Sequence, residues 1–385
     1  MARSHPSPPW WRRSSSSAPR RPRRGPRDVN VHTVIDAAGP TEVGVLDDGR
    51  AVHRITLGRA PGVVLEALTL GASVHRLEVS GPGGVRRNVV LGHATIQDRL
   101  AGGAYLGATV GRYANRIAHG RFPLDGREVV VGVHDRGHSL HGGPDGFDRR
   151  VWEVVAHGPD EVTLRLVSPD GDQGFPGEVV ATVRYVVAGD VVRVEMGATV
   201  DAPTVVNLTN HAYFNLDGEG AGTVDDHLLT VAADEYTPVD GGSIPVGDHA
   251  PVDGTPFDLR TPVRLGAVVR SGHPQVLGSG GIDHNFVVRG TGMRRHASLE
   301  SPRSGIRLDL SSDQPGLQVY TGNFLAGSPA STSGVRYRQG DGIALEPQLY
   351  PDTPNRPAWP SAQVAPGDTY AATLQWAFSR SRRQA

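Results

Sequence analysis

The sequence predicts an all-β fold, a large antiparallel β-sandwich, and three observations support this prediction. Apolar and polar residues alternate in several short runs, as they do in strands that are buried on one face. Glycine and proline are abundant, with 50 and 30 among 385 residues, and they separate these runs as turns do. No long stretch combines a 3.6-residue hydrophobic period with the caps that begin and end a helix.

The clearest pair of predicted strands lies at residues 179–196. In VVATVRYVV, residues 179–187, every second side chain is apolar on one face. The chain then turns at Ala188-Gly189-Asp190 and returns as VVRVEM, where Arg193 and Glu195 take the polar face. This pattern predicts a hairpin that is half buried. An Asp125-Gly126 turn predicts a second hairpin, and similar runs occur at 162–166, 306–310 and 372–378.

The organisation of the chain predicts one domain after a short tail. Residues 1–30 are rich in Arg, Ser and Pro and have no apolar pattern, so we expect a disordered tail there. Residues 31–385 contain no linker that would divide them, and we expect a single β-sandwich domain. The start of the chain lacks the apolar region of a secretory signal, and no apolar run could span a bilayer. A cytoplasmic location without membrane contact is therefore expected.

Composition excludes several classes of chemistry. The net charge of −1 provides no field that would attract nucleic acid or an anionic membrane, so neither is an expected partner. The 39 basic residues are all Arg, and the sequence contains neither Lys nor Cys. Schiff-base chemistry on lysine, thiolate nucleophiles and cysteine-ligated metals are thereby excluded.

Polar and aromatic residues interrupt the strand pattern in four segments, 107–122, 138–152, 205–216 and 344–355. Directed amide and guanidinium groups such as Asn115 and Arg116 suit a ligand rich in hydroxyls, and aromatic rings suit the apolar faces of sugars. His211 can transfer a proton near neutral pH. Glu346 enters an apolar stretch, which would raise its pKa toward that of a general base. An acid/base pair in a polyol site is the resulting hypothesis.

Plainer interpretations of these residues stay open on residue types alone. His211 could be a structural histidine, and Glu346 could serve only as the partner of an arginine. The spacing His138-x-x-His141, with His211 and His284 elsewhere, could indicate a metal site, but an H-x-x-H pair on a loop is weak evidence. We expect no metal and no cofactor.

The ordered set of segments resembles the aldose 1-epimerase (galactose mutarotase) family. GRYANRI, LHGG followed by GFD, NLTNHAYFNL, DEYTPVD, DHNF, QVYTGNF and ALEPQ–PDTPN occur in the order typical of that family, from about Asn88 to Phe378. The resemblance implies the galactose mutarotase-like supersandwich, His211 as general acid and Glu346 as general base. It also implies five sugar-binding residues: Asn115, Arg116, His141, Asp283 and Gln318.

The resemblance further implies a reaction and a substrate. Glu346 would take the proton of the anomeric hydroxyl O1 while His211 gives one to the ring oxygen O5, so that a free aldohexose such as glucose or galactose opens and recloses. The expected partner is this small sugar, with the protein a monomer or homodimer. Two departures from the family pattern are Leu208, where many relatives have Pro, and Leu349, where many have His; the second could alter which hydroxyl pattern is preferred.

Three alternatives remain at this point. A glycoside hydrolase would use two carboxylates, Asp283 and Glu346, and would leave His211 unexplained. A carbohydrate-binding module would need the amides and aromatics but no acid/base pair. A relative that acts on hexose 6-phosphates would need a cluster of cations at the far end of the pocket.

Overall fold

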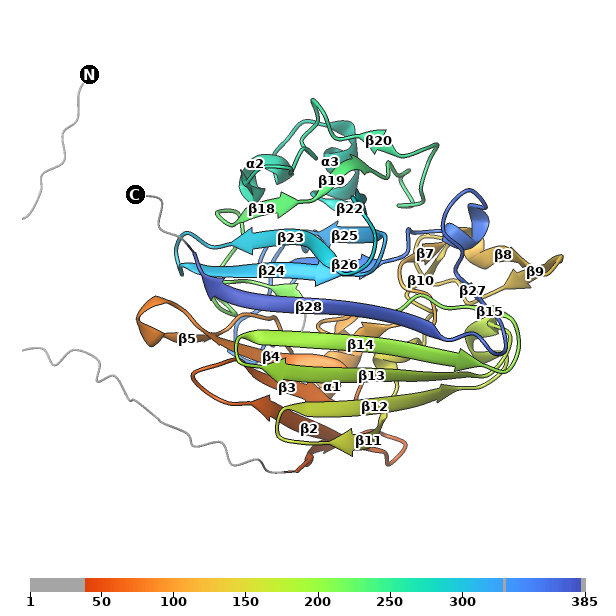
Figure 1. Ribbon diagram of the computed structural model, residues 1–385, viewed down its shortest axis with the longest axis horizontal. Coiled ribbons are helices and arrows are strands. Elements are labelled where there is room, and N and C mark those ends of the chain that lie inside the picture. The colour runs from red at the N-terminus through yellow and green to blue at the C-terminus, as the bar shows by residue number, and fades with distance from the viewer. Residues whose placement is uncertain (1–38, 328–329, 382–385) are drawn as a thin grey trace, which may run out of the picture. The chain divides into compact units, whose positions relative to one another are not determined.

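The computed structural model describes residues 39–327 and 330–381 of the chain. The predicted tail, residues 1–30, lies outside the described residues, so the division into a tail and one domain stays a prediction. The regular structure is mostly antiparallel strand, which confirms the all-β class (Figure 1). The described helices are short: α1 (Ile96–Gly102), α2 (Leu265–Val269) and α3 (Pro274–Ser279). In the described part of the chain, no helix is long and apolar enough to cross a membrane.

A nine-stranded sheet forms one layer of the sandwich. Its strands lie in the order β11-β12-β13-β14-β28-β24-β23-β18-β21. Their bounds are β11 Glu153–His157, β12 Glu161–Ser168, β13 Val179–Ala188, β14 Val191–Val200, β18 Leu228–Val231, β21 Val263–Arg264, β23 Arg294–Glu300, β24 Ile306–Ser312 and β28 Tyr370–Arg380. The predicted hairpin at 179–196 is therefore confirmed as β13 and β14, which pair along their whole length.

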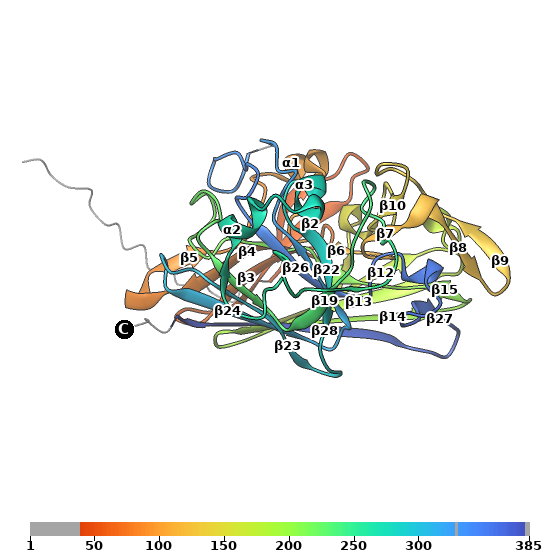
Figure 2. The same ribbon diagram turned by 90° about the horizontal axis from the view of Figure 1, so that it is seen from above.

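Two smaller sheets face this layer. The five-stranded sheet has the order β1-β2-β3-β4-β5, with bounds Thr41–Val45, Ala51–Gly58, Val64–Leu68, Ser73–Ser80 and Arg86–Asn88. The six-stranded sheet has the order β17-β26-β25-β22-β19-β20, with bounds Tyr213–Phe214, Ile343–Gln348, Gly316–Tyr320, Asp283–Val288, Ala233–Tyr236 and Ala250–Pro251. In Figure 2 the nine-stranded sheet lies along the lower edge, β22 and β26 lie above it, and α1 and α3 lie near the top.

One continuous apolar core joins the three sheets. Leu65 from the five-stranded sheet, Val183 and Trp376 from the nine-stranded sheet, and Phe286 and Leu345 from the six-stranded sheet all belong to it. Because side chains alternate along a strand, each of these strands contributes every second residue to the core. Burial of this apolar surface is the main stabilising contribution to the fold.

Short strand pairs and turns complete the structure at the edges. The pairs are β6 (Thr109–Val110) with β16 (Thr209–Asn210), β7 (Arg116–Ile117) with β10 (Ser139–Leu140), β8 (Arg121–Leu124) with β9 (Arg127–Val130), and β15 (Thr204–Val205) with β27 (Gln363–Val364). The 3₁₀ turns are η1 Pro82–Gly84, η2 Ala118–Gly120, η3 Phe147–Arg149, η4 Asp172–Gly174 and η5 Thr353–Asn355. The predicted Asp125-Gly126 turn joins β8 to β9, and both residues have the positive φ that a two-residue hairpin turn requires.

The face of the six-stranded sheet turned away from the core is also buried, but it is polar. Asp283, Asn285, Gln318, Glu346 and Gln348 lie on this face, and each is less than 9% exposed. Buried polar side chains on a sheet face are costly unless they are satisfied, so this face is the place to look for a site.

Candidate active site

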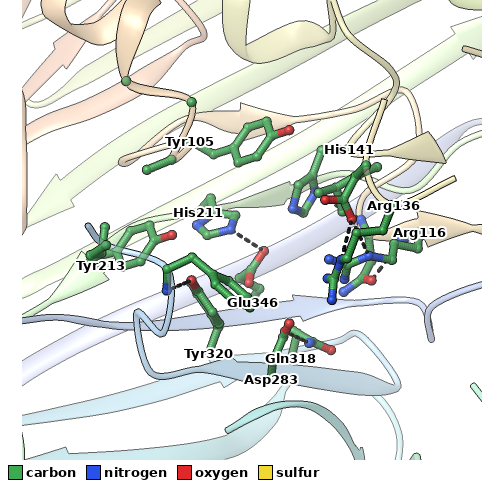
Figure 3. A pocket seen from close by; sticks show the side chains of 18 residues that line it. Tyr105, Arg116, Arg136, His141, His211, Tyr213, Asp283, Gln318, Tyr320 and Glu346 are labelled. Carbon is green, nitrogen blue, oxygen red and sulfur yellow. Dashed lines mark hydrogen bonds and ion pairs between the residues drawn. The ribbon is translucent and has the colours of Figure 1, made fainter. Parts of the chain in front are cut away.

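A single cavity of about 400 Å³ lies over the polar face of the six-stranded sheet (Figure 3). All seven residues that the sequence predicted as catalytic or sugar-binding line it: Asn115, Arg116, His141, His211, Asp283, Gln318 and Glu346. They come from β7, β22, β25, β26 and the loops next to β7, β10 and β16, which lie far apart in the sequence. The size is that of a small-molecule pocket.

Three neighbouring strands form the floor of the cavity. Gln318 on β25 lies directly opposite Glu346 on β26, and Asp283 begins the next strand, β22. Gln318 Nε2 donates a hydrogen bond of 2.7 Å to Asp283 Oδ1, which fixes both side chains. Gln318 Oε1 and Glu346 Oε2 are buried and have no hydrogen-bond partner among the described residues. Such atoms are suited to meet the hydroxyl groups of a ligand.

His211 lies between β16 and β17, and its backbone is held on both sides. Its N–H donates to Ala108 O at 2.8 Å, and its carbonyl accepts from Gly107 N–H at 2.9 Å. The side chain of Asn210 binds Gly107 O at 2.9 Å and the Ala212 N–H at 3.1 Å, so it locks the turn around the histidine. β17 pairs with β26 and thereby brings His211 beside Glu346.

One wall of the cavity is built by Asn115, Arg116 and His141. The His141 N–H donates to Asn115 O, and the Asn115 N–H donates to His141 Nδ1, both at 3.1 Å. Asn115 and His141 adopt positive φ angles of 67° and 49°, a region that few non-glycine residues occupy. This backbone strain is common where side chains must point into a site.

The Glu346 carboxylate and the His211 ring form the central pair. His211 Nε2 and Glu346 Oε2 are 3.6 Å apart, and their side chains are 5% and 2% exposed. Burial lowers the pKa of His211 to about 4. Burial also raises the pKa of Glu346 well above its ordinary value, with a further rise from Asp283 and an opposing effect of Arg116. Burial therefore shifts the two pKa values in opposite directions, as expected for a carboxyl and an imidazole that are buried together.

Burial of the pair opposes the charged forms that the expected proton transfers need. Burial disfavours the charged form of both partners, and a backbone hydrogen bond opposes this effect on His211 to a smaller extent. The environment thus favours the neutral imidazole of His211 and the neutral carboxylic acid of Glu346.

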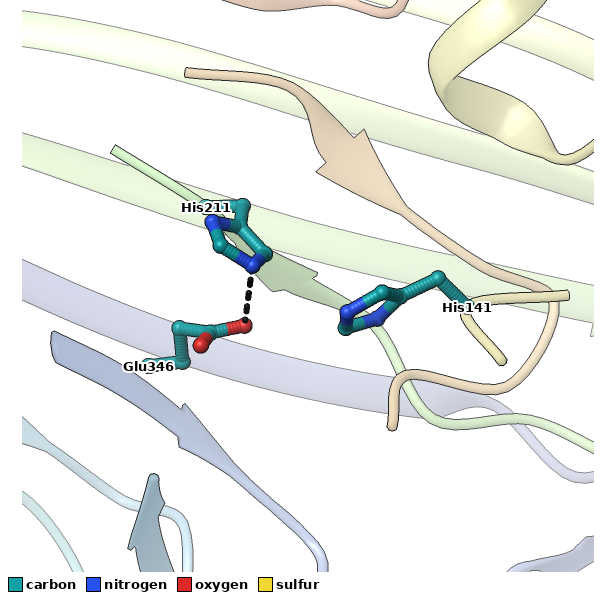
Figure 4. Close-up of side chains that lie close together, drawn as sticks. All are labelled: His141, His211 and Glu346. Carbon is teal, nitrogen blue, oxygen red and sulfur yellow. Dashed lines mark ion pairs between the residues drawn. The ribbon is translucent and has the colours of Figure 1, made fainter. Parts of the chain in front are cut away.

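The structure also bears on metal binding. Ligand atoms of His141, His211 and Glu346 all lie within 4.8 Å of one another (Figure 4). A metal-bound histidine donates a hydrogen bond from its other ring nitrogen. His141 Nδ1 instead accepts one from the Asn115 N–H, so its Nε2 carries the hydrogen and is a donor toward the cavity. This geometry fits a ligand hydroxyl better than a metal ion.

The other histidines of the metal hypothesis lie elsewhere. His284 points to the opposite face of β22, where its Nε2 lies 3.0 Å from Gln275 Oε1 and its ring contacts Phe257. His138 Nδ1 accepts from the His119 N–H at 3.0 Å. Neither lines the cavity.

Sequence reasoning missed several residues of the cavity. Tyr105 and Tyr213 stack on the His211 ring, and Tyr320 meets it edge-on. Asp135 binds the buried Arg116 through Asp135 Oδ2 and Arg116 Nε, 2.9 Å apart. The only signal for Tyr105 was the glycine-rich break AGGAY before GATVGRYANRI, and Asp135 lies in the polar HDRGH loop.

The two departures from the family pattern lie outside the cavity. Leu349 packs against the cluster around Tyr113 and donates its backbone N–H to Asn207 Oδ1 at 3.0 Å. Leu208 is in the core. Because Leu349 does not line the cavity, it cannot select a hydroxyl pattern by direct contact.

Comparisons with known proteins identify the family of this chain. The aldose 1-epimerase family model matches residues 53–377. Galactose mutarotase from Rattus norvegicus is 41% identical over 334 residues, which cover 86% of this chain and 95% of the relative. Aldose 1-epimerase from Escherichia coli K12 is 38% identical over 336 residues, with 86% and 96% covered.

Solved structures are similar over the same length. An aldose epimerase homologue from C. elegans has a TM-score of 0.80 at 30% identity, with 86% of this chain and all of the other covered. Galactose 1-epimerase from Lactobacillus acidophilus has a TM-score of 0.78 at 26% identity, with 89% and 99% covered. The match in sequence, fold and length shows that this chain belongs to the aldose 1-epimerase family and is an isomerase of that class.

Proposed function

We propose that this protein interconverts the α and β anomers of free aldohexoses, glucose and galactose among them, with Glu346 and His211 as its acid/base pair. The observation that carries the assignment of residues is the 3.6 Å approach of His211 Nε2 to Glu346 Oε2 on the floor of a sugar-sized cavity. Membership of the aldose 1-epimerase family supplies the reaction class.

The reaction needs one proton to leave O1 and one to reach O5. Glu346 accepts the O1 proton in its carboxylate form, and His211 donates to O5 in its imidazolium form. The C1–O5 bond then breaks, the open aldehyde turns about C1–C2, and the ring recloses with the two roles reversed. The reactive form has Glu346 ionised and His211 protonated, and burial of both side chains opposes this form. Each proton transfer by a positioned group contributes roughly 10²–10⁴ in rate.

The remaining cavity residues hold the rest of the sugar. His141 Nε2 and the Arg116 guanidinium are donors, Asp283 is an acceptor, and Gln318 offers an unpaired carbonyl oxygen. Tyr213 and Tyr320 provide ring surfaces for the apolar side of the sugar. Holding these hydroxyls leaves only the C1 end free to turn, which lowers the entropic part of the barrier.

Uncharged sugars are the proposed substrates, in preference to hexose 6-phosphates. Two arginines, Arg116 and Arg136, line the cavity, but both pair with Asp135, at 2.9 and 3.6 Å. Arg136 also donates to Gly241 O and Ser243 Oγ. Asp135 partly neutralises the charge of both arginines, and the hydrogen bonds of Arg136 direct its guanidinium to protein acceptors, so the pair forms a weak phosphate site. The proposal includes a cytoplasmic, monomeric or homodimeric enzyme whose partner is the sugar.

Polarimetry tests the proposal directly. Protein dialysed against a chelator should accelerate the rotation change of freshly dissolved α-D-glucose and α-D-galactose. Nitrophenyl glycosides of both sugars should release no nitrophenol, because a blocked O1 has no proton for Glu346 to remove. Activity that vanished on chelation and returned with a metal would refute the cofactor-free mechanism. Nitrophenol release that is lost in Glu346→Gln would instead indicate a hydrolase.

A further inference from the structure

Four aromatic rings of the described residues contact the His211 ring. Tyr213 stacks on it with ring centroids 5.0 Å apart, and Tyr105 stacks at 5.7 Å, each with an interplanar angle of 29°. His141 and Tyr320 meet it edge-on at 5.2 and 6.4 Å. In Figure 3 the imidazole lies between the two stacked tyrosines and above Glu346.

These aromatic groups come from separate parts of the fold. Tyr105 follows α1, Tyr213 is on β17, Tyr320 on β25 and His141 follows β10. Tyr105 adopts a positive φ of 56° to reach this position. A strained residue that is held against a reacting group by a short glycine-rich segment indicates a role beyond packing.

Charged groups near His211 are few. Among the described residues, Glu346 is the one charged side chain recorded in contact with the ring, at 3.6 Å. Asp283 and Arg116 act on Glu346 rather than touching the histidine. His141 is neutral because burial lowers its pKa well below the usual value. Burial raises the pKa of both Tyr105 and Tyr213, so their rings remain uncharged.

We propose that Tyr105 and Tyr213 form an aromatic cage whose ring faces stabilise the imidazolium form of His211, making them positioning residues for the general acid. The face of a tyrosine ring carries negative potential and attracts a cation within about 6 Å, which both rings satisfy. Burial in the cavity removes water from His211 and so opposes its protonation. The cage partly offsets this cost of lost hydration. This inference rests on the proposed role of His211 as the acid.

The test replaces Tyr105 or Tyr213 with phenylalanines that carry one, two or five fluorine atoms. Fluorination weakens the negative ring face in steps and nearly preserves ring size. We expect the pH at which ¹⁵N-labelled His211 becomes protonated to fall in steps, by on the order of half to one pH unit for the pentafluoro ring. The pH midpoint of the acid limb of kcat/KM should fall together with the midpoint of His211, and kcat should drop several-fold.

Two controls separate the cage from simple packing. Tyr105→Phe keeps the ring face and should leave the His211 midpoint unchanged, whereas Tyr105→Leu should lower it. The same fluorinated series at Phe324, a cavity residue with no recorded ring contact to His211, should leave the midpoint in place. If Tyr105→Leu does not fold, the fluorinated series alone decides. A midpoint that does not respond to fluorination at either tyrosine would overturn the cage while leaving mutarotation by the wild type intact.

Discussion

The nine-stranded and the six-stranded sheets of this protein differ in how many of their faces are buried. In β13 and β28 buried and partly exposed residues alternate along most of the strand, and the outer face carries cross-strand ion pairs such as Arg184–Glu195. In β25 and β26 nearly every residue is buried, and the face away from the core carries Gln318 and Glu346. The outer face of the large sheet is polar because it meets water. The second face of the small sheet is polar although little of it meets water.

This difference separates polar residues that serve the fold from those that serve the site. A solvated ion pair contributes little to stability and can be replaced cheaply. A buried carboxyl whose oxygen has no hydrogen-bond partner, as in Glu346, costs free energy, and the proposed acid/base role accounts for its presence. We therefore expect a substitution on the polar face of the six-stranded sheet to lower activity. A substitution on the outer face of the nine-stranded sheet should leave activity unchanged and alter stability only slightly.

The largest expected difference is in kcat. Glu346→Gln should lower kcat by roughly 10²–10⁴ with little change in KM, because the amide cannot exchange the O1 proton. Glu195→Gln, the same change on the outer face of β14, should leave both constants unaltered. Polarimetric progress curves over a range of sugar concentrations measure both. A Glu346→Gln enzyme with near-normal kcat would remove Glu346 from the mechanism.

The next effect is on stability as a function of pH. The pKa of His211 is about 4 in the folded protein and near 6.5 when unfolded. Its contribution to stability is therefore present above pH 6.5 and is lost as the pH falls toward 4. The loss is about 3 kcal/mol. His211→Asn should lack this loss, so thermal unfolding of the two proteins should diverge between pH 6.5 and 4. Parallel curves would show that burial does not lower the pKa of His211.

A smaller effect is expected at Asp135. Asp135→Asn leaves the 8%-exposed side chain of Arg116 without its carboxylate partner. The guanidinium should lose its fixed position, so KM should rise roughly five- to tenfold, about 1–1.4 kcal/mol, while kcat changes less. Asp135→Glu should restore part of the affinity. Glu128→Gln, which breaks the exposed Arg121–Glu128 pair, is the matched control and should leave KM unchanged. An equal fall in kcat would instead place Arg116 in the chemical step.

The smallest effect should be the stability change at the outer face. Arg184 and Glu195 face each other across β13 and β14, and their side chains are 42% and 34% exposed. Glu195→Gln should change the free energy of unfolding by about 0.2–1 kcal/mol, and less at high salt. Urea titrations at low and high ionic strength measure this. A loss of several kcal/mol that does not depend on salt would show that Arg184 and Glu195 do not behave as a solvent-screened surface pair.

The sequence by itself determined the fold class, the β13–β14 and β8–β9 hairpins and the family. These features depend on local patterns: a two-residue period, a turn dipeptide with positive φ, and motifs read within a few residues of one another. It also named seven residues that line one cavity, although their individual roles stay predictions. Tertiary structure alone decided what surrounds them. Tyr213 lies within the motif NLTNHAYFNL, but nothing local shows that its ring stacks on His211. Tyr105 and Asp135, further partners of His211 and Arg116, stand in segments with no distinctive pattern and reach the site only through long-range pairing. Tertiary structure also decided the direction of the pKa shifts of His211 and Glu346, because desolvation depends on every element packed around a group and not on the residues beside it in the chain.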